Sequence, residues 1–433
     1  MFYRVKLSGL PIILPARDQR RRSSEKRQLF ISNPRKICYH KTSHPSLCHG
    51  RARLRPPRFR GQQTERRIML IYQIGLVVVI AACIFGVIYM TGAVGKFGLI
   101  RKVSGQRKWV RCGISFALLL GLFLLFTFLM TVFDAVIIFL HVLFFFLIFD
   151  AVFRLIGKKE KEPPKVFWQG WLALAAAAVC LICGYFQCVH VWKTEYTLAT
   201  DKTVGEVRIA LLSDSHVGAT FDGDGFASYI EEIMKQEPDL ILIPGDFVDD
   251  DTTRADMLTA CEALGKADPK YGIWFSYGNH DKGYGLRRDF SAEDLARALE
   301  ENGVHILEDA AAYTGDLCLI GRKDASARSR RELAELLEGA EPGKYVIVLD
   351  HEPNDYDKEA ATEADLVVSG HTHGGQLIPL GLIGRLFGGI DRTYGYEKRS
   401  GTDFIVTSGI SNWAVHFKTG TRSEYVIITV RGK

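Results

Sequence analysis

The sequence predicts a layered α/β sandwich preceded by a region of four transmembrane helices. Two contrasting patterns support this prediction. Residues 68–192 contain long apolar stretches with few charges, and about 20 apolar residues suffice to cross the hydrocarbon core of a bilayer. From about Glu206 onward, short runs of aliphatic and β-branched residues alternate with helical stretches, which is typical of an α/β fold. We therefore expect a basic arm at 1–67, four transmembrane helices at 68–192 and the sandwich at 193–433.

The net charge of +6 is distributed unevenly along the 433 residues. Residues 1–67 contain eighteen Lys and Arg against three acidic residues, a net charge of +15, so the remainder carries −9. This arm mixes Arg, Pro, Ser and His without an apolar period, which indicates disorder. It could contact nucleic acid or anionic lipid, or be absent from the mature protein if translation begins at Met69. Because the folded part is not basic, we expect no nucleic-acid partner.

The apolar region predicts four spans separated by two basic loops. Lys and Arg in short loops remain on the cytoplasmic side of a membrane. The two basic loops lie on the same side of a four-span bundle, so the C-terminal domain is expected to be extracytoplasmic in a multi-pass protein of the cell membrane. The positive arm upstream conflicts with this orientation unless the chain starts at Met69. The spans are expected at 68–91, 112–132, 135–154 and 167–190.

Asp134 and His141 are the polar residues of interest within these spans. Ionisable groups inside a bilayer can form a proton or ion path. The alternative, which we favour, is a turn residue and a histidine that forms a hydrogen bond inside the helix bundle.

Seven short apolar runs predict the strands of the sandwich, and four longer stretches predict its helices. Runs of this length and composition are typical of strands buried on both faces. The strands are expected at 207–213, 239–244, 272–277, 345–350, 364–369, 403–408 and 425–430. The helices are expected at 225–236, 253–265, 291–302 and 329–338.

Five of these runs end in residues that can bind metal ions. In an open α/β sheet, ligands bind beyond the carboxyl ends of the strands, so five separate runs would deliver their side chains to one sheet edge. The five ends are Asp214-Ser215-His216, Gly245-Asp246, Gly278-Asn279-His280-Asp281, Asp350-His351 and Gly370-His371-Thr372-His373-Gly374-Gly375.

The residue types at these ends suit divalent metal ions. Asp and His offer oxygen and nitrogen ligands for Mn, Fe or Zn, and one carboxylate can bridge two ions. Two ions about 3.5–4 Å apart can clamp both oxygens of an in-line phosphoryl displacement. Any one of these residues alone is more often a turn or cap residue. Their joint occurrence at five strand ends favours a metal site.

The five motifs resemble, in order, those of the calcineurin-like metallophosphoesterase superfamily, over about 206–433. The segment Ser-Gly-His-Thr-His-Gly-Gly-Gln at 369–376 is most similar to a membrane-associated bacterial phosphohydrolase branch. The resemblance implies two divalent ions and a bridging Asp246. It implies that His280 is catalytic, stabilising charge or protonating the leaving oxygen, although His280 could instead orient a ligand. The ligands of the first ion would be Asp214, His216 and His373, and those of the second Asn279, His351 and His371.

The sequence therefore predicts a membrane-anchored, metal-dependent phosphoesterase that hydrolyses phosphate mono- or diesters by a two-metal mechanism. Proximity to a bilayer favours a phospholipid, a lipid-linked pyrophosphate or an envelope phosphodiester as substrate. The alternative is a membrane sensor or scaffold whose metal-binding domain signals without turnover. Repeated catalytic cycles would distinguish the two.

Three further segments have weaker interpretations. Lys282, Arg287 and Arg288 could contact a phosphate, but a solvated helix start is favoured. Asp222 and its neighbours resemble half a calcium loop without the required spacing, and we expect a turn. Residues 381–396 could form an apolar lip over the site for a lipid-like substrate, and a surface loop is favoured.

Overall fold

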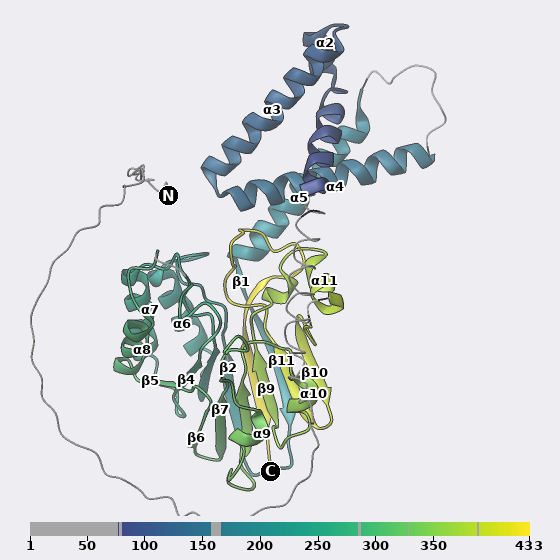
Figure 1. Ribbon diagram of the computed structural model, residues 1–433. Coiled ribbons are helices and arrows are strands. Elements are labelled where there is room, and N and C mark those ends of the chain that lie inside the picture. The colour runs from purple at the N-terminus through teal and green to yellow at the C-terminus, as the bar shows by residue number, and fades with distance from the viewer. Residues whose placement is uncertain (1–76, 78–79, 157–165, 285–286, 328, 388) are drawn as a thin grey trace, which may run out of the picture. The chain divides into compact units, whose positions relative to one another are not determined.

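The computed structural model describes residues 77, 80–156, 166–284, 287–327, 329–387 and 389–433 (Figure 1). The basic arm at 1–67 and the alternative start at Met69 lie outside the described residues. So do the first part of the span expected at 68–91 and most of the second basic loop, at 157–165.

Three described helices are long and apolar enough to cross a membrane, and a bent helix pair raises this to four if the pair counts as one span. The three match the spans expected at 112–132, 135–154 and 167–190 to within a few residues. They are α3 (Lys108–Leu129), α4 (Val132–Ile156) and α5 (Trp168–Val189). The bent pair consists of a helix at Ile80–Val94 and α2 (Gly98–Ser104), which meet at 80°.

Helix α2 was not predicted, because its sequence was expected to form part of a basic loop. The chain turns before α2 at Phe97, whose backbone is extended. The Phe97 ring packs edge-to-face against Phe167 and Trp171, with centroids 5.2 and 5.1 Å away. Arg101 and Lys102 lie in the last turn of α2, where positive charge is favourable beside the helix dipole. The sequence prediction was wrong here because anchoring by distant aromatic rings leaves no local pattern.

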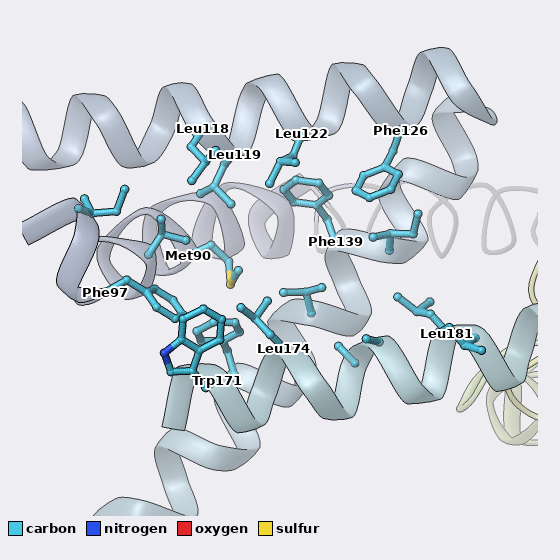
Figure 2. A pocket seen from close by; sticks show the side chains of 18 of the residues that line it. Met90, Phe97, Leu118, Leu119, Leu122, Phe126, Phe139, Trp171, Leu174 and Leu181 are labelled. Carbon is cyan, nitrogen blue, oxygen red and sulfur yellow. The ribbon is translucent and has the colours of Figure 1, made fainter. Parts of the chain in front are cut away.

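An apolar pocket of about 960 Å³ lies between these helices (Figure 2). Met90, Leu119, Phe139 and Leu174 line its middle part, and each comes from a different helix.

The first β-sheet of the C-terminal domain has six strands. Its edge strand β1 begins at Val191, directly after α5, and pairs in parallel with β12. Strand β12 is antiparallel to β2, and the remaining strands are parallel to β2. The order is β1 (Val191–Ala199), β12 (Ser423–Arg431), β2 (Glu206–Leu211), β3 (Leu240–Pro244), β4 (Ile273–Ser276) and β5 (Val304–Ile306).

The second sheet also has six strands, and its four central strands are parallel. The two edge strands, β10 and β6, are antiparallel to their neighbours. The order is β10 (Gly395–Arg399), β11 (Thr402–Val406), β9 (Leu366–Ser369), β8 (Tyr345–Leu349), β7 (Leu317–Gly321) and β6 (Ala310–Thr314).

Apolar side chains of both sheets form one core, which includes Leu242 and Val426 of the first sheet and Ile347 and Val368 of the second. Separate apolar clusters join each sheet to helices. The arrangement is the predicted layered α/β sandwich. The first sheet packs against α6 (Gly223–Met234), α7 (Arg254–Lys266) and α8 (Ala292–Glu301), and the second against α9 (Leu333–Leu336) and α10 (Tyr356–Glu359).

Several elements differ from the prediction. The helix expected at 329–338 is reduced to the four residues of α9. Residues 381–396, for which a surface loop was favoured, contribute to helix α11 (Leu380–Phe387) and to the start of β10. The expected turn at Asp222 is the N-cap of α6, where its carboxylate accepts a hydrogen bond from the Gly225 amide. Strands β1, β5, β6 and β10 were not predicted, because they are edge strands that are short or contain polar residues or Ala. Strand β7 was also not predicted, although its five residues are all buried.

Candidate metal centre

The candidate ligands follow the carboxyl ends of five strands that belong to two different sheets. Asp214 and His216 follow β2, and Asp246 follows β3, both in the first sheet. His351 follows β8 in the second sheet. The expectation of a single sheet edge is therefore corrected: the site lies where the carboxyl ends of both sheets meet. Asn279 and His280 follow β4, and His371 and His373 follow β9.

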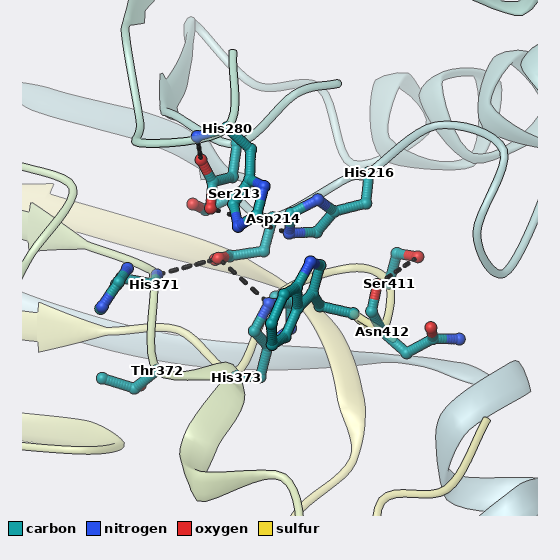
Figure 3. Close-up of polar contacts among 12 residues, drawn as sticks. Ser213, Asp214, His216, His280, His371, Thr372, His373, Ser411 and Asn412 are labelled. Carbon is teal, nitrogen blue, oxygen red and sulfur yellow. Dashed lines mark hydrogen bonds and ion pairs between the residues drawn. The ribbon is translucent and has the colours of Figure 1, made fainter. Parts of the chain in front are cut away.

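Six of the candidate ligands form two compact groups. Figure 3 shows the three residues of the first group together with His371 of the second. Within each group, one ligand atom per residue lies within 4.8 Å of the others. The first group contains Asp214, His216 and His373, and the second contains Asp246, His351 and His371.

Short contacts join the two groups and include the seventh candidate, Asn279. The backbone N–H of His371 donates to the Asp214 carboxylate at 2.9 Å. The Asn279 Oδ1 atom lies 2.9 Å from Nδ1 of His371. His216 Nε2 is 3.7 Å from the Asp246 carboxylate, which belongs to the other group. All seven candidates therefore lie in one site.

The backbone at this site is strained. Five of the candidate ligands have positive φ angles, a region that L-residues other than glycine rarely adopt. Such conformations cost about 1–3 kcal/mol each and persist only where the surroundings impose them. Their concentration here indicates that the fold holds these side chains in position at the expense of stability. The angles are 53° for Asp214, 36° for His216, 53° for Asp246, 66° for His371 and 46° for His373.

Two glycines permit the close approach of these segments. A Cβ atom on Gly370 would overlap the side chains of Ser213 and Asp214. A Cβ atom on Gly278 would overlap the carboxylate of Asp246. Any side chain at either position would displace a candidate ligand.

Asp281 fixes the turn that carries Asp246. Its buried carboxylate accepts hydrogen bonds from the backbone N–H groups of Asp246, Phe247 and Gly278, at 2.8, 2.8 and 2.7 Å. Burial raises the pKa of Asp281 to about 7. Sequence reasoning named Asp281 only as part of a motif, because a role that depends on N–H groups 35 residues away has no local signal.

The buried imidazoles are oriented as metal ligands commonly are. The Nδ1–H of His351 donates to the Pro244 carbonyl at 2.8 Å, so its Nε2 faces the Asp246 carboxylate at 3.0 Å. Metal-bound histidines usually donate their second ring nitrogen in this way. Nε2 of His216 and Nδ1 of His373 are buried without a hydrogen-bond partner among the described residues. Buried polar atoms rarely remain unpaired, so the donor set fits divalent cations.

The protonation states of two of the four candidate histidine ligands suit cation binding. Burial lowers the pKa of His371 to about 4 and that of His373 well below its usual value, so both imidazoles are neutral and can donate lone pairs. Burial also disfavours a charged His351, but the neighbouring Asp246 carboxylate prevails and raises the pKa of His351 well above its usual value. Burial raises the pKa of Asp214, whose charge is costly without a cation.

His280 lies beside the ligands but belongs to neither group. Its backbone N–H donates to Asp246 Oδ1 at 2.8 Å. Its ring is partly exposed and lies 5.2 Å from the His216 ring and 5.4 Å from the Trp413 ring. Burial lowers the pKa of His280. The side chain is therefore free to meet a substrate.

Not every polar residue at the strand ends joins the site. Asp350 pairs with the buried Arg322 at 2.8 Å. Lys282 pairs with Glu308 at 2.6 Å, and Arg288 donates to the backbone carbonyl of Asp281 at 2.8 Å. Arg287 is exposed.

Sequence reasoning missed Lys418, which is fully buried near the site. Its ammonium donates to the carbonyl of Ser408 at 2.8 Å. Burial lowers the pKa of Lys418 to about 8. A lysine in a polar loop looks solvated, so its sequence gives no sign of this position.

Sequence reasoning also missed His416, which binds the transmembrane region. Its backbone N–H and Nδ1 each lie 2.8 Å from the carboxylate of Asp134, in the first turn of α4. Thr131 also donates to this carboxylate, at 2.8 Å. The His141 Nδ1–H donates to the carbonyl of Ile137, and its Nε2 lies 3.4 Å from the hydroxyl of Thr419. Asp134 and His141 thus both contact the segment 416–419.

Comparisons with known proteins agree with this site. A family model described as calcineurin-like phosphoesterase matches residues 207–375. An uncharacterized metallophosphoesterase of Aquifex aeolicus is 30% identical over 248 residues, covering 55% of this chain and 91% of the relative. The chain belongs to the calcineurin-like phosphoesterase family.

Two further relatives are informative, one because it is named as a transmembrane protein and the other because the match covers only part of its length. A zebrafish (Danio rerio) relative named transmembrane protein with metallophosphoesterase domain is 28% identical over 320 residues, covering 67% of this chain and 70% of its own. An uncharacterized metallophosphoesterase of Helicobacter pylori is 31% identical over 248 residues, covering 55% of this chain. The match spans 64% of that relative's length.

Proposed function

We propose that this protein is a membrane-anchored phosphoesterase that hydrolyses phosphate mono- or diesters at a centre of two divalent metal ions. One observation carries the proposal: two groups of buried Asp and His side chains converge from two sheets and leave imidazole nitrogens unpaired. Imidazole nitrogens are common metal ligands in proteins, so unpaired nitrogens beside buried carboxylates support a metal centre. Membership of a phosphoesterase family supports the reaction class.

The ligand assignment follows the two groups. Asp214, His216 and His373 would hold one ion, and Asp246 would bridge to the second. Two such ions supply a nucleophile at neutral pH and stabilise negative charge at phosphorus. Mn, Fe and Zn suit these ligands. Asn279, His351 and His371 would hold the second ion.

The step not assigned to the metal ligands is the stabilisation or protonation of the leaving group, for which His280 is the candidate. In hydrolysis, a water oxygen forms a bond to phosphorus, the bond from phosphorus to the ester oxygen breaks, and the departing oxygen gains a proton. The ring of His280 lies 5.2 Å from that of His216 in the first group, and His280 belongs to neither group. We assign it the stabilisation of phosphoryl charge or proton donation to the leaving oxygen.

The side of the membrane on which the sandwich lies can be inferred from the transmembrane helices and the charged residues beside them. Apolar helices precede the sandwich, and one named relative is transmembrane. The basic residues around α2 favour a cytoplasmic location for that end of the bundle, so we propose an extracytoplasmic sandwich, with its domain boundary near residue 193. A C-terminal reporter enzyme that is active only outside the cytoplasm tests this orientation. Activity confined to the cytoplasm would contradict it.

The proposed activity is tested with the full chain purified in detergent. After treatment with a chelator, the protein is supplied with Mn²⁺, Fe²⁺ or Zn²⁺, and hydrolysis of an aryl phosphomonoester and an aryl phosphodiester is followed. We expect many turnovers that depend on the metal. Binding of metal or phosphate without turnover would favour the sensor or scaffold instead.

The role of His280 is tested by His280→Ala. Loss of a positioned acid–base group lowers rates by about 10²–10⁴-fold, and the metal content of the protein should not change. His305, an exposed histidine on β5, provides the matched control His305→Ala, which should retain wild-type activity. Equal rates for the two variants would contradict the catalytic assignment.

A further inference from the structure

The pocket between the transmembrane helices is suited to a hydrocarbon chain. Its lining is almost wholly apolar and comes from α2 to α5 and the helix at Ile80–Val94 (Figure 2). Its volume of about 960 Å³ is at the upper end of typical ligand sites. Among the described residues, its lining offers no cluster of charges or hydrogen-bonding groups that would select a polar ligand.

The pocket is also long. Along α5 its lining runs from Trp171 to Tyr185, fourteen residues apart, which corresponds to about 21 Å at 1.5 Å per residue. The hydrocarbon of one bilayer leaflet is about half of 30 Å thick. The pocket can therefore accommodate the acyl chain of a membrane lipid along its whole length.

A loop of the sandwich contacts both one end of the pocket and the surroundings of the candidate metal centre. Phe417, from the sandwich, lines this end and packs with Leu181 of α5 in one apolar cluster. The same loop carries Trp413, whose ring lies 5.4 Å from that of His280. The Gln376 amide, directly after the His371–Gly375 motif, donates to the carbonyls of Trp413 and Val415 at 3.3 and 3.0 Å. A chain in the pocket would thus end beside the loop that contacts His280.

Helix α11 adds an apolar surface beside the site. It contacts the short helix η1 (His373–Gly375), which carries the ligand His373. Leu382, Ile383 and Leu386 of α11 are exposed. Leu377, three residues before α11, packs with Ile138 of α4 and Leu181 of α5. An exposed amphipathic helix that follows this contact is suited to the headgroup region of a bilayer.

We propose that the pocket binds an acyl chain of the substrate, which makes the substrate a phosphate ester of a membrane lipid. This inference rests on the proposed phosphoesterase function and narrows its substrate class. The acyl chain lies between the helices, and the headgroup phosphate lies at the metal ligands. Hydrolysis releases inorganic phosphate from a monoester or a headgroup fragment from a diester, while the acyl-bearing portion remains in the membrane.

The test fills the pocket without changing the site. Ala178 lines the pocket on α5, and Ala178→Trp would occupy part of its volume. Ala175, one turn away, is exposed and is not among the lining residues, so Ala175→Trp is the matched control. Leu122→Trp repeats the filling from α3 on another wall and serves if Ala178→Trp does not fold.

Each variant is assayed in detergent with an aryl phosphate, with dihexanoyl forms of phosphatidic acid and phosphatidylglycerol, and with the dioleoyl forms of the same lipids. For Ala178→Trp we expect at least about a tenfold loss of kcat/KM with the dioleoyl lipids, because contacts of several methylene groups are lost. Its aryl phosphate activity should stay within about twofold of wild type. Ala175→Trp should match wild type with every substrate.

The outcomes separate this inference from the function on which it rests. If wild type hydrolyses aryl phosphates but neither lipid, or if the filled variants retain the dioleoyl rates, the lipid inference is overturned and the phosphoesterase stands. If wild type hydrolyses none of these substrates with any of the metals, the proposed function fails and the inference fails with it.

Discussion

Two clusters of buried ionisable side chains lie on opposite sides of the consecutive residues Asp350 and His351. Successive residues of an extended chain point in opposite directions, so Asp350 enters one cluster and His351 the other. Asp350 and Glu359 lie 2.8 and 3.1 Å from the guanidinium of the buried Arg322. His351 instead faces the Asp246 carboxylate at 3.0 Å, in the candidate metal centre.

The two clusters differ in where their positive charge originates. The Arg322 cluster contains a permanent cation, because arginine stays protonated in proteins. The candidate metal centre has two buried carboxylates, Asp214 and Asp246, surrounded by imidazoles, of which His371 and His373 are neutral. The first cluster carries its positive charge on the chain itself, whereas in the second the neutral imidazoles of His371 and His373 can donate lone pairs to an added cation. Among the described residues, buried atoms without a hydrogen-bond partner occur in both clusters, including Nε of Arg322 and Oδ1 of Asp350. What distinguishes the candidate metal centre is therefore the presence of neutral imidazole nitrogens beside buried carboxylates.

The largest expected effect is the loss of activity in Asp246→Asn. This change keeps the size of the side chain but removes the charge proposed to bridge two ions. Metal ions contribute several kcal/mol to stabilising such transition states, so kcat/KM for an aryl phosphate should fall by about 10³-fold or more. Asp224→Asn, on α6, is the control and should be as active as wild type. If Asp246→Asn retained more than about a tenth of the wild-type activity, Asp246 would not bridge two catalytic ions, and the proposed difference between the two clusters would be contradicted.

Arg322→Met should produce the opposite phenotype. Removing one partner of a buried ion pair costs about 3–5 kcal/mol, so the variant should unfold at a clearly lower temperature or denaturant concentration. The metal ligands are untouched, and activity per folded molecule should stay near that of wild type. Unfolding monitored alongside metal-dependent hydrolysis checks both points. A stable variant with weakened metal binding would show that the two clusters are one unit.

Added metal should stabilise only proteins with an intact centre. At a free Mn²⁺ concentration 100 times the dissociation constant, one site contributes about 2.7 kcal/mol to stability. We expect this increment in wild type and in Arg322→Met, and a much smaller one in His351→Ala. Thermal unfolding with and without Mn²⁺, after chelation, provides the measurement. Equal stabilisation of all three proteins would place the bound metal elsewhere.

The smallest expected effect on stability comes from the ion pair between Asp134 and His416. The positive charge of this pair depends on pH, because it is carried by the His416 ring. The hydrogen bond that the His416 ring donates to the Asp134 carboxylate raises the pKa of His416 above its usual value of 6.5. A raised histidine pKa means that the pair's stabilisation is fully present below pH of about 6.5 and is lost as the pH rises through the folded-state pKa. Hydrogen bonds to charged groups contribute about 1.5–3 kcal/mol, and partial exposure reduces this toward about 1–2 kcal/mol.

Asp134→Asn tests this pair. The stability difference from wild type should be larger near pH 6 than near pH 9, because the histidine loses its charge in between. Asp150→Asn is the control, since Asp150 pairs with Arg154 and Lys96 near the other end of α4. A difference that does not vary with pH would show that His416 is neutral in the folded protein.

Much of the architecture could be predicted from local sequence. The buried central strands, such as β3 and β8, are continuous aliphatic runs bounded by turns, and the spans α3 to α5 are long apolar segments. Both signals lie within a single segment of chain. Edge strands such as β1 and β6 were missed because half of their side chains contact solvent, and the short helix α2 because distant aromatic rings hold the bend before it.

The residues of the candidate site also fall into those that the sequence predicted and those that only the structure showed. The residue types at the strand ends, and their resemblance to a family pattern, are visible in the sequence alone, while their roles as metal ligands remain predictions. The roles of Asp281, Lys418 and His416 were not visible, because each depends on backbone or side-chain partners distant in sequence. For Asp350 and His351, the family resemblance named His351 as the ligand, and the structure shows that His351 faces Asp246 while Asp350 faces Arg322.

The boundaries of the apolar segments and the side chains at their ends could be predicted from the sequence. Both can be read from a short stretch of neighbouring residues, because they depend only on local hydrophobic pattern and residue type. Only the tertiary structure decided that two sheets share the site, and that Asp134 binds His416. It also decided that the long apolar pocket ends at Phe417. These features arise from packing between segments separated by many residues, where the energy of each contact depends on the whole fold.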